Sequence, residues 1–184
     1  MIEPMKQKIA IGVTLALTVV LLGGLGAYVG YASKFEYRTH VVLHAPADRV
    51  WKVLNSAGAQ KRWFRSADGQ FKLEELTLST GVTHQLGTLR SVHFLPLGKW
   101  QEKVVIYEAE SRLETLAEGS GPFKSLRVTY QFIQSQEGQI QLSVVCQVKL
   151  RGIGTVLFKR AAVKHTLEST FDYSLLGIKA LSGG

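Results

Sequence analysis

The chain has 184 residues, the length of one domain with an appendage, which argues against several independent domains. Lys and Arg together number 22, Asp and Glu 14, and the formal net charge is +8, while 46% of the residues are hydrophobic. This composition excludes an acidic disordered chain and indicates a basic globular protein. The single cysteine, Cys146, excludes an intramolecular disulfide and a zinc site built from several cysteines.

The first segment has the pattern of a membrane helix. No residue from Ile9 to Ala32 is charged, and about 20 apolar helical residues suffice to cross a bilayer. Lys6 and Lys8 precede this run and Lys34 follows it, so both ends can contact lipid headgroups. We therefore expect a single-pass transmembrane anchor. A cleaved signal peptide is the competing interpretation, because a basic start and a small-residue end fit that segment too.

This interpretation divides the chain into a short basic tail (1–8), a transmembrane anchor (9–32) and a soluble domain (33–184). The basic tail ahead of the first apolar helix favours a cytoplasmic N-terminus, which places the soluble domain outside the cytoplasm. Gly26 and Gly30 have the spacing that lets two membrane helices approach closely, so self-association through the anchor is a secondary expectation.

After the anchor, the sequence predicts one strand and two short helices. Apolar and polar residues alternate from Phe35 to Leu43, which is typical of a half-buried strand. The helical spacing of Val50, Trp51 and Leu54 then predicts a helix from Ala47 to Asn55. A second short helix is expected from Gly58 to Ser66.

A run of strands follows, with expected ranges 71–79, 87–95, 100–110, 112–119, 124–134 and 139–150. The last two alternate most clearly, and Gln136 to Gly138 suit a tight turn, so the sheet is expected to be antiparallel. Thr155 is the expected N-cap of a final helix running to about Leu181. The apolar stripe of that helix should cover the sheet.

Two segments resemble a known family. The phrase HAPADRVWKVLN (44–55) and the stretch WQEKVVIYEAESRLETLAEGSGPFKSLRVTYQF (100–132), followed by a long C-terminal helix, are similar to the START-like helix-grip superfamily of SRPBCC type, which includes polyketide cyclase/dehydrase and lipid-transport domains. The resemblance covers about Phe35 to Leu181. It implies an α+β fold in which a curved antiparallel sheet wraps around a long C-terminal helix. The expected transmembrane helix that precedes it is an addition that most members of the superfamily lack. It also implies an apolar cavity that binds lipids, quinones, sterols or polyketides.

Residues on the apolar faces of the predicted strands and the last helix are therefore candidates for lining a ligand cavity. Each also has a structural interpretation, because buried tyrosine and cysteine commonly serve packing alone. The candidates are Tyr107, Tyr130, Val144, Cys146, Val163, Leu167, Phe171 and His93.

Two basic clusters are candidates for contact with a membrane surface. The first, Lys61, Arg62 and Arg65, surrounds Trp63 and Phe64, and the second is Lys159 and Arg160 near the start of the last helix. Basic residues interleaved with aromatics also suit nucleic acid. For a chain tethered to a bilayer, we rank anionic headgroups above RNA as the partner.

No pattern indicates catalysis, a metal or a cofactor. The sequence contains no HExxH, CxxC, GxSxG, GxxxxGKS or GxGxxG motif, and His40 and His44 are too far apart on a strand to share one ion. We therefore expect a membrane-anchored binding protein for a hydrophobic small molecule or lipid, with no catalytic, metal-ligating or cofactor-binding residue identified. The alternatives are a cyclase or dehydrase type of enzyme acting on a hydrophobic substrate, and a protein or RNA interaction module using the basic surface.

Overall fold

The structure is a computed structural model that describes residues 3–67, 69, 72–79, 84–95, 98–119, 121–134 and 139–183; side chains are described from residue 17 onward, except at positions 94, 95 and 158. Its elements follow the chain in this order: α1 (Glu3–Ala32), β1 (Lys34–Leu43), α2 (Ala47–Asn55), α3 (Ala57–Trp63), β2 (Lys72–Leu78), β3 (Leu89–Leu95), β4 (Gly98–Glu108), β5 (Arg112–Glu118), β6 (Phe123–Gln134), β7 (Ile140–Leu150), the π-helical turn η1 (Thr155–Lys159) and α4 (Arg160–Ser182).

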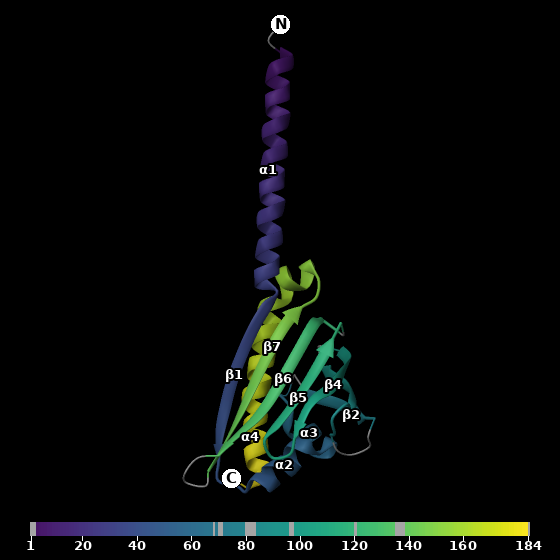
Figure 1. Cartoon of the computed structure of the whole chain (residues 1–184), viewed down its shortest axis with the longest axis vertical. Helices are drawn as coiled ribbons and strands as arrows, with labels where there is room; N and C mark the ends of the chain where they lie inside the picture. The colour runs from purple at the N-terminus through teal and green to yellow at the C-terminus, as the bar shows by residue number, and fades with distance from the viewer. Residues whose placement is uncertain are drawn as a thin grey trace.

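The strands form one antiparallel sheet of seven, in the order β1-β7-β6-β5-β4-β3-β2. Consecutive strands are neighbours from β2 to β7, and β1 then pairs with β7, the last strand. The curved sheet lies over α4, and α2 and α3 occupy the connection between β1 and β2 (Figure 1). The long helix is thereby held between the sheet and the two short helices, and it contacts β1, β7, α2 and α3.

An apolar core lies between these layers. Alternate residues of β6 and β7 are buried, including Val128, Tyr130, Val144 and Cys146, as the period of two in the sequence predicts. On α4 the buried residues recur at helical spacing, and they belong to the same core cluster as the strand residues. The expected α+β arrangement, a curved antiparallel sheet on a long C-terminal helix, is confirmed.

Most expected elements are found, with shifts at several ends. The helix α2 has the predicted limits, whereas α3 ends at Trp63 rather than Ser66, because Phe64 leaves helical geometry and Arg65 makes a bridge to Lys72. The expected N-cap at Thr155 is wrong: Thr155 lies within η1, a helical turn that leads directly into α4. The expected turn at 136–138 lies outside the described residues.

The N-terminal helix α1 extends away from the domain (Figure 1) and contacts β1 and η1. Its described side chains begin at residue 17, so residues 9–16 of the expected anchor, like the whole tail 1–8, lie outside the described side chains. Among the described residues, no helix is long and apolar enough to cross a membrane.

Candidate functional site

The six cavity candidates from β6, β7 and α4 come together inside the grip. Tyr130 pairs with Val144 across β6 and β7, so both side chains point to the same face of the sheet. All six are buried in the core cluster that joins sheet and helix: Tyr130, Val144, Cys146, Val163, Leu167 and Phe171. Burial raises the pKa of the Tyr130 hydroxyl and of the Cys146 thiol. The positive charge of Arg90 opposes this rise at Tyr130, and the Glu102 carboxylate adds to it at both groups. Both groups are therefore neutral at physiological pH.

Of the other two cavity candidates, Tyr107 lies on the same face of the sheet as Tyr130 and packs against the core cluster, whereas His93 does not. Tyr107 is partly buried in β4, where its hydroxyl accepts a hydrogen bond from Nδ2 of Asn55 at 3.0 Å. His93 lies on the opposite face of β3 from Arg90, and its Nδ1 is 3.0 Å from a carboxylate oxygen of Glu74. His93 therefore sits with the surface groups of β2 and β3 and not among the core residues.

A buried ion pair, which no sequence motif indicates, lies on the inner face of the sheet. Arg90 of β3 and Glu102 of β4 are register partners, both about 7% exposed, with Nε and Oε2 3.6 Å apart. Nε1 of Trp100 donates to Glu102 Oε1 at 2.7 Å, and the Arg90 guanidinium donates to Oε1 of Gln60 at 3.2 Å. The pair connects β3, β4 and α3 inside the domain, close to Tyr130 and Cys146.

His84 extends this polar cluster toward α2. The residue is fully buried, its backbone N–H donates to Oδ1 of Asn55 at 3.0 Å, and its Nδ1 lies 2.8 Å from the Asn55 carbonyl oxygen. Burial lowers the pKa of His84 to about 3, and the positive charge of Arg90 contributes to the lowering. The imidazole is therefore neutral, Nδ1 donates to the carbonyl, and Nε2 is left as an acceptor.

The buried face of α4 carries hydroxyl groups beside its apolar side chains. Thr166 donates to the carbonyl oxygen of Ala162 at 2.7 Å, an ordinary bond within the helix. Thr170 and Ser174, one and two turns further on, are equally buried, but their hydroxyls have no hydrogen-bond partner among the described residues. The same is true of Nε2 of His84 and of Nε of Arg90. Buried polar atoms in proteins are nearly always satisfied, so each of these four atoms requires an explanation.

The structure separates the two basic clusters that the sequence suggested as membrane contacts. Lys61, Arg62 and Arg65 are exposed on and just after α3, and the Arg65 guanidinium lies 5.7 Å from the ring centre of Tyr173. Lys159 and Arg160 lie at the other end of the domain, where η1 contacts α1 (Figure 1). The two clusters therefore cannot belong to one flat contact surface at the end of α1.

Among the described residues, no group of three His, Cys, Asp or Glu side chains is close enough to hold a metal ion. The sequence did not predict that these polar groups meet, because they are distant in the chain: Asn55, Gln60, His84, Arg90 and Glu102 come from five different segments. One signal was present. Arg90, Val92 and Trp100 fall on positions that share a face in a strand pair, so Arg90 could have been assigned to the core side.

Comparisons of the whole fold identify its class. The protein TTHA0849 from Thermus thermophilus superimposes with a TM-score of 0.63 at 18% identity, covering 80% of this chain and 97% of that one. CV1439 from Chromobacterium violaceum gives 0.58 at 17%, covering 82% and 99%. Norcoclaurine synthase from Thalictrum flavum, solved with dopamine and hydroxybenzaldehyde, gives 0.55 at 16%, covering 80% and 86%.

These structures are START-like, also called Bet v1-like, folds with a curved antiparallel sheet and a C-terminal helix. The domain of this chain thus has the helix-grip fold that the sequence resemblance implied. No family model matches the sequence, and no curated protein matches it either.

Proposed function

We propose that this chain is a membrane-anchored binding protein whose helix-grip domain holds a hydrophobic small molecule or lipid between the sheet and α4. The observation that carries the proposal is four buried polar atoms with no hydrogen-bond partner among the described residues: Nε2 of His84, Nε of Arg90, whose nearest charged partner is Oε2 of Glu102 at 3.6 Å, and the hydroxyls of Thr170 and Ser174. Each such atom costs about 1 to 3 kcal/mol when it stays unsatisfied. A ligand that forms hydrogen bonds with them offsets that cost.

The surrounding side chains define the chemistry of the ligand. Val144, Leu167 and Phe171 offer apolar contacts, which suit a hydrophobic body. Glu102 balances the charge of Arg90, so a neutral hydroxyl or carbonyl group fits this interior better than a further ion. The norcoclaurine synthase structure is a complex with dopamine and hydroxybenzaldehyde, which are small aromatic molecules with polar groups held by a protein of this fold.

The contacts of Glu102, the buried carboxylate described on the inner face of the sheet, favour binding over catalysis. One oxygen of Glu102 accepts from Trp100 and the other faces Arg90, so neither is placed as a free acid or base. Neutral His84 offers an acceptor, but its pKa of about 3 makes it a weak base. A cyclase or dehydrase activity has no comparable support.

The anchor is supported by the uncharged run 9–32 and by the exposure of its described part. Large apolar side chains of α1 that no described part of the domain covers are Leu17, Val19, Val20, Leu21, Leu22 and Leu25. A bilayer is the environment that accepts such a surface. The proposed location is a single-pass membrane protein with the domain outside the cytoplasm. Retention of the full chain in alkaline carbonate tests the anchor, and a mature N-terminus at or near Ser33 would contradict it.

The ligand is tested by removing the hydroxyls that have no partner. The double variant Thr170→Val, Ser174→Ala keeps the shape of α4 and breaks no internal hydrogen bond seen among the described residues. Full-length protein extracted from its native membrane should carry a bound molecule in native mass spectrometry, and the double variant should lose it. The stability of the variant should be unchanged or higher, because a buried unsatisfied group is removed.

The matched control is Thr166→Val, on the same buried face of α4, whose hydroxyl is already satisfied by Ala162. This variant should keep the bound molecule. Parent protein that carries no ligand, or a double variant that retains it as fully as the control does, would show that the hydroxyls do not serve ligand binding.

A further inference from the structure

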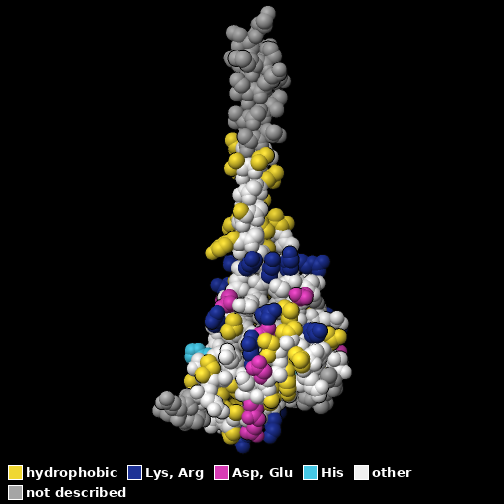
Figure 2. All heavy atoms as spheres, in the orientation of Figure 1, with side chains coloured by type: hydrophobic (Ala, Val, Ile, Leu, Met, Phe, Trp, Pro, Cys, Tyr) yellow, Lys and Arg dark blue, Asp and Glu magenta, His cyan; other side chains and the backbone are white. Residues whose placement is uncertain are grey.

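Basic side chains from distant segments meet at the end of the domain next to α1. Lys34 at the start of β1 is the register partner of Lys149 at the end of β7. Arg151 donates to the carbonyl oxygen of Gly119, and Arg160 donates through Nε to the carbonyl oxygen of Ala32, the last residue of α1. Figure 2 shows a row of Lys and Arg side chains across the domain just below α1. Lys124, at the start of β6, lies at the same end because Phe123 is the register partner of Leu150. We call these five residues the basic collar: Lys34, Lys124, Lys149, Arg151 and Arg160.

The charge of the collar is open to an external partner. None of its five side chains is within ion-pair distance of a carboxylate among the residues that the structure describes. Two acidic residues, Glu36 and Glu118, line the same surface depression as Lys34, Lys149 and Arg160. Glu36 is already engaged by Arg38 and Gln147. The excess charge at this end is therefore positive.

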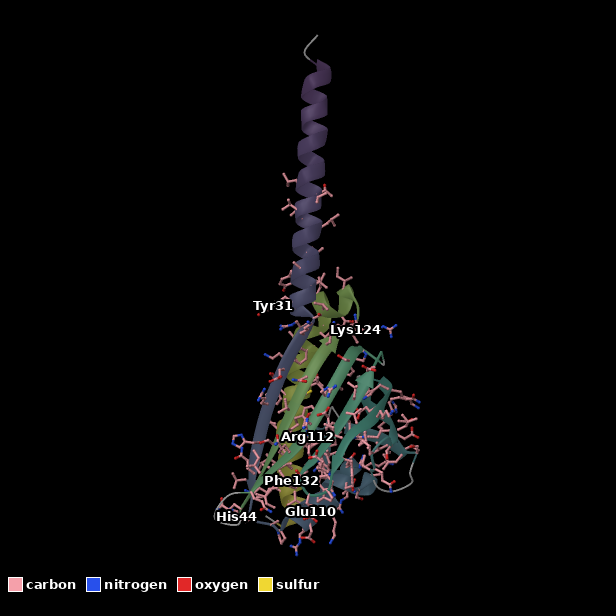
Figure 3. The ribbon with its side chains drawn as sticks, viewed as in Figure 1. Tyr31, His44, Glu110, Arg112, Lys124 and Phe132 are labelled. Atoms are coloured by element: carbon pink, nitrogen blue, oxygen red, sulfur yellow. The ribbon has the colours of Figure 1, made fainter. Side chains whose placement is uncertain are left out.

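Exposed apolar side chains stand beside the collar, on the side of α1. Tyr31 in the last turn of α1 is 82% exposed, and Ile153 and Leu157, in the connection from β7 to α4, are 53% and 41% exposed. The turn η1 contacts α1, so these residues lie at one end of the domain. Tyr31 and Lys124 are seen at that end in Figure 3, whereas His44 and Glu110 mark the opposite end. We call Tyr31, Ile153 and Leu157 the apolar tip.

We propose that this end of the domain docks onto the anionic surface of the bilayer that holds α1. The apolar tip enters the interface between headgroups and acyl chains, and the basic collar contacts the headgroups around it. The surface depression of about 900 Å³, lined by Tyr31, Lys34, Lys149 and Arg160 among others, gives a headgroup room beside the helix. A bilayer fits better than an acidic protein or RNA, because the apolar tip continues directly into the apolar surface of α1.

Docking would give the domain one orientation on the membrane. The basic residues of α3 that the sequence suggested, Lys61 and Arg62, would then not lie in the contact. The proposal rests on the membrane anchor of the proposed function but not on its ligand, and the experiment separates the two.

The test places an environment-sensitive fluorophore on the apolar tip of the full chain. Ile153→Cys is labelled with a nitrobenzoxadiazole maleimide, and native Cys146 stays unlabelled because it is fully buried. The matched label is Glu110→Cys, at the far end of the domain. Both proteins are reconstituted in vesicles of phosphatidylcholine alone or with added phosphatidylglycerol, and emission and quenching by lipid-attached spin labels are measured.

In vesicles with the anionic lipid, the emission of the label at 153 should shift to shorter wavelength and be quenched by the lipid-attached spin labels. The emission of the label at 110 should neither shift nor be quenched. High salt should reverse much of the shift, because headgroup attraction is screened. The double variant Lys124→Glu, Lys149→Glu should lose most of the emission shift at 153, whereas the double variant Lys61→Glu, Arg62→Glu should keep it. Equal signals from both labels, or the same signal on neutral and anionic vesicles, would overturn the docking surface, as would salt-sensitive RNA binding without any shift.

Alkaline carbonate washing of the same vesicles, after the fluorescence has been read, reports on the anchor alone. A chain that washes off contradicts the anchor of the proposed function. A chain that stays while the label at 153 remains in water contradicts only the docking surface. Loss of the bound ligand in the variants of α4 bears on neither result.

Discussion

Trp63 of α3 lies directly against the backbone of Gly177 in α4: a Cβ atom at position 177 would be 2.8 Å from Cβ and 3.1 Å from Cα of Trp63. Trp63 is almost fully buried, and its Nε1 donates to the carbonyl oxygen of Val53 in α2. The close contact of α3 with α4 therefore requires glycine, which has no side chain, at position 177. It sets how closely the two short helices approach the long one.

Gly177→Ala should destabilise the domain, although alanine in an exposed helix normally stabilises by about 1 kcal/mol relative to glycine. The added methyl meets the backbone of α3, which cannot rotate away, and overpacking of this kind costs about 1 to 3 kcal/mol. Thermal or urea unfolding of the protein measures the change. Gly154→Ala is the control, because nothing lies within 4 Å of its added Cβ and its backbone is helical; loss of stability in the control but not at 177 would contradict the interpretation.

His84 should make the stability fall in weakly acidic solution. The folded state holds its pKa at about 3, mainly through burial, whereas the unfolded chain has the ordinary value near 6.5. Between these values the unfolded state binds the proton and the folded state does not, so stability falls as pH drops from 6.5 toward 3. The full slope is about 1.4 kcal/mol per pH unit. The free energy of unfolding of the parent minus that of His84→Gln, measured as a function of pH, should show this slope. A difference that does not change with pH would exclude it.

Removing one member of the buried pair of Arg90 and Glu102 should cost far more than removing both. Arg90→Met leaves the buried carboxylate without its counter-charge, and Glu102→Leu leaves the buried guanidinium without its own. Each single change should lower the free energy of unfolding by about 3 to 5 kcal/mol. The double variant restores neutrality with apolar side chains of similar size and should recover much of that loss. A double-mutant cycle of unfolding free energies measures the coupling. Additive losses would mean that the two charges do not interact.

A hydrogen bond of Tyr37 connects β1 to α4, and it should make the free energy of unfolding fall in alkaline solution. Its hydroxyl donates to Asp172 Oδ1, which also accepts from Thr39. Burial and this carboxylate raise the pKa of Tyr37 to about 12. Because the folded pKa exceeds the ordinary value of 10, the unfolded chain loses its proton first, and stability falls as pH rises from 10 toward 12. Tyr37→Phe should remove this dependence and lower stability at neutral pH, with Thr39→Val as the comparison at the same carboxylate. The free energies of unfolding of the parent and the two variants, measured between neutral and alkaline pH, test this prediction. An unchanged loss of stability at alkaline pH in Tyr37→Phe would show that Tyr37 does not cause it.

Local patterns determined the secondary structure and much of the core. The alternation around Tyr130 and Cys146 predicted which side chains of β6 and β7 are buried, because side chains of a strand point to alternate faces whatever its partners are. The spacing of Val50, Trp51 and Leu54 predicted α2 with its limits. The N-cap at Thr155 was wrong, since a threonine before an apolar stripe does not reveal that the preceding turn is already helical.

Only the tertiary structure decided which groups meet. His84 is buried because Asn55, at the end of α2, binds its backbone and ring, and Arg90 is tolerated in the core because β4 brings Glu102 opposite it. The basic collar likewise joins the ends of strands that are far apart in sequence. Such pairings depend on register and on the crossing of layers, which arise from long-range packing. A periodicity reports the face on which a residue lies, but not the residue that faces it.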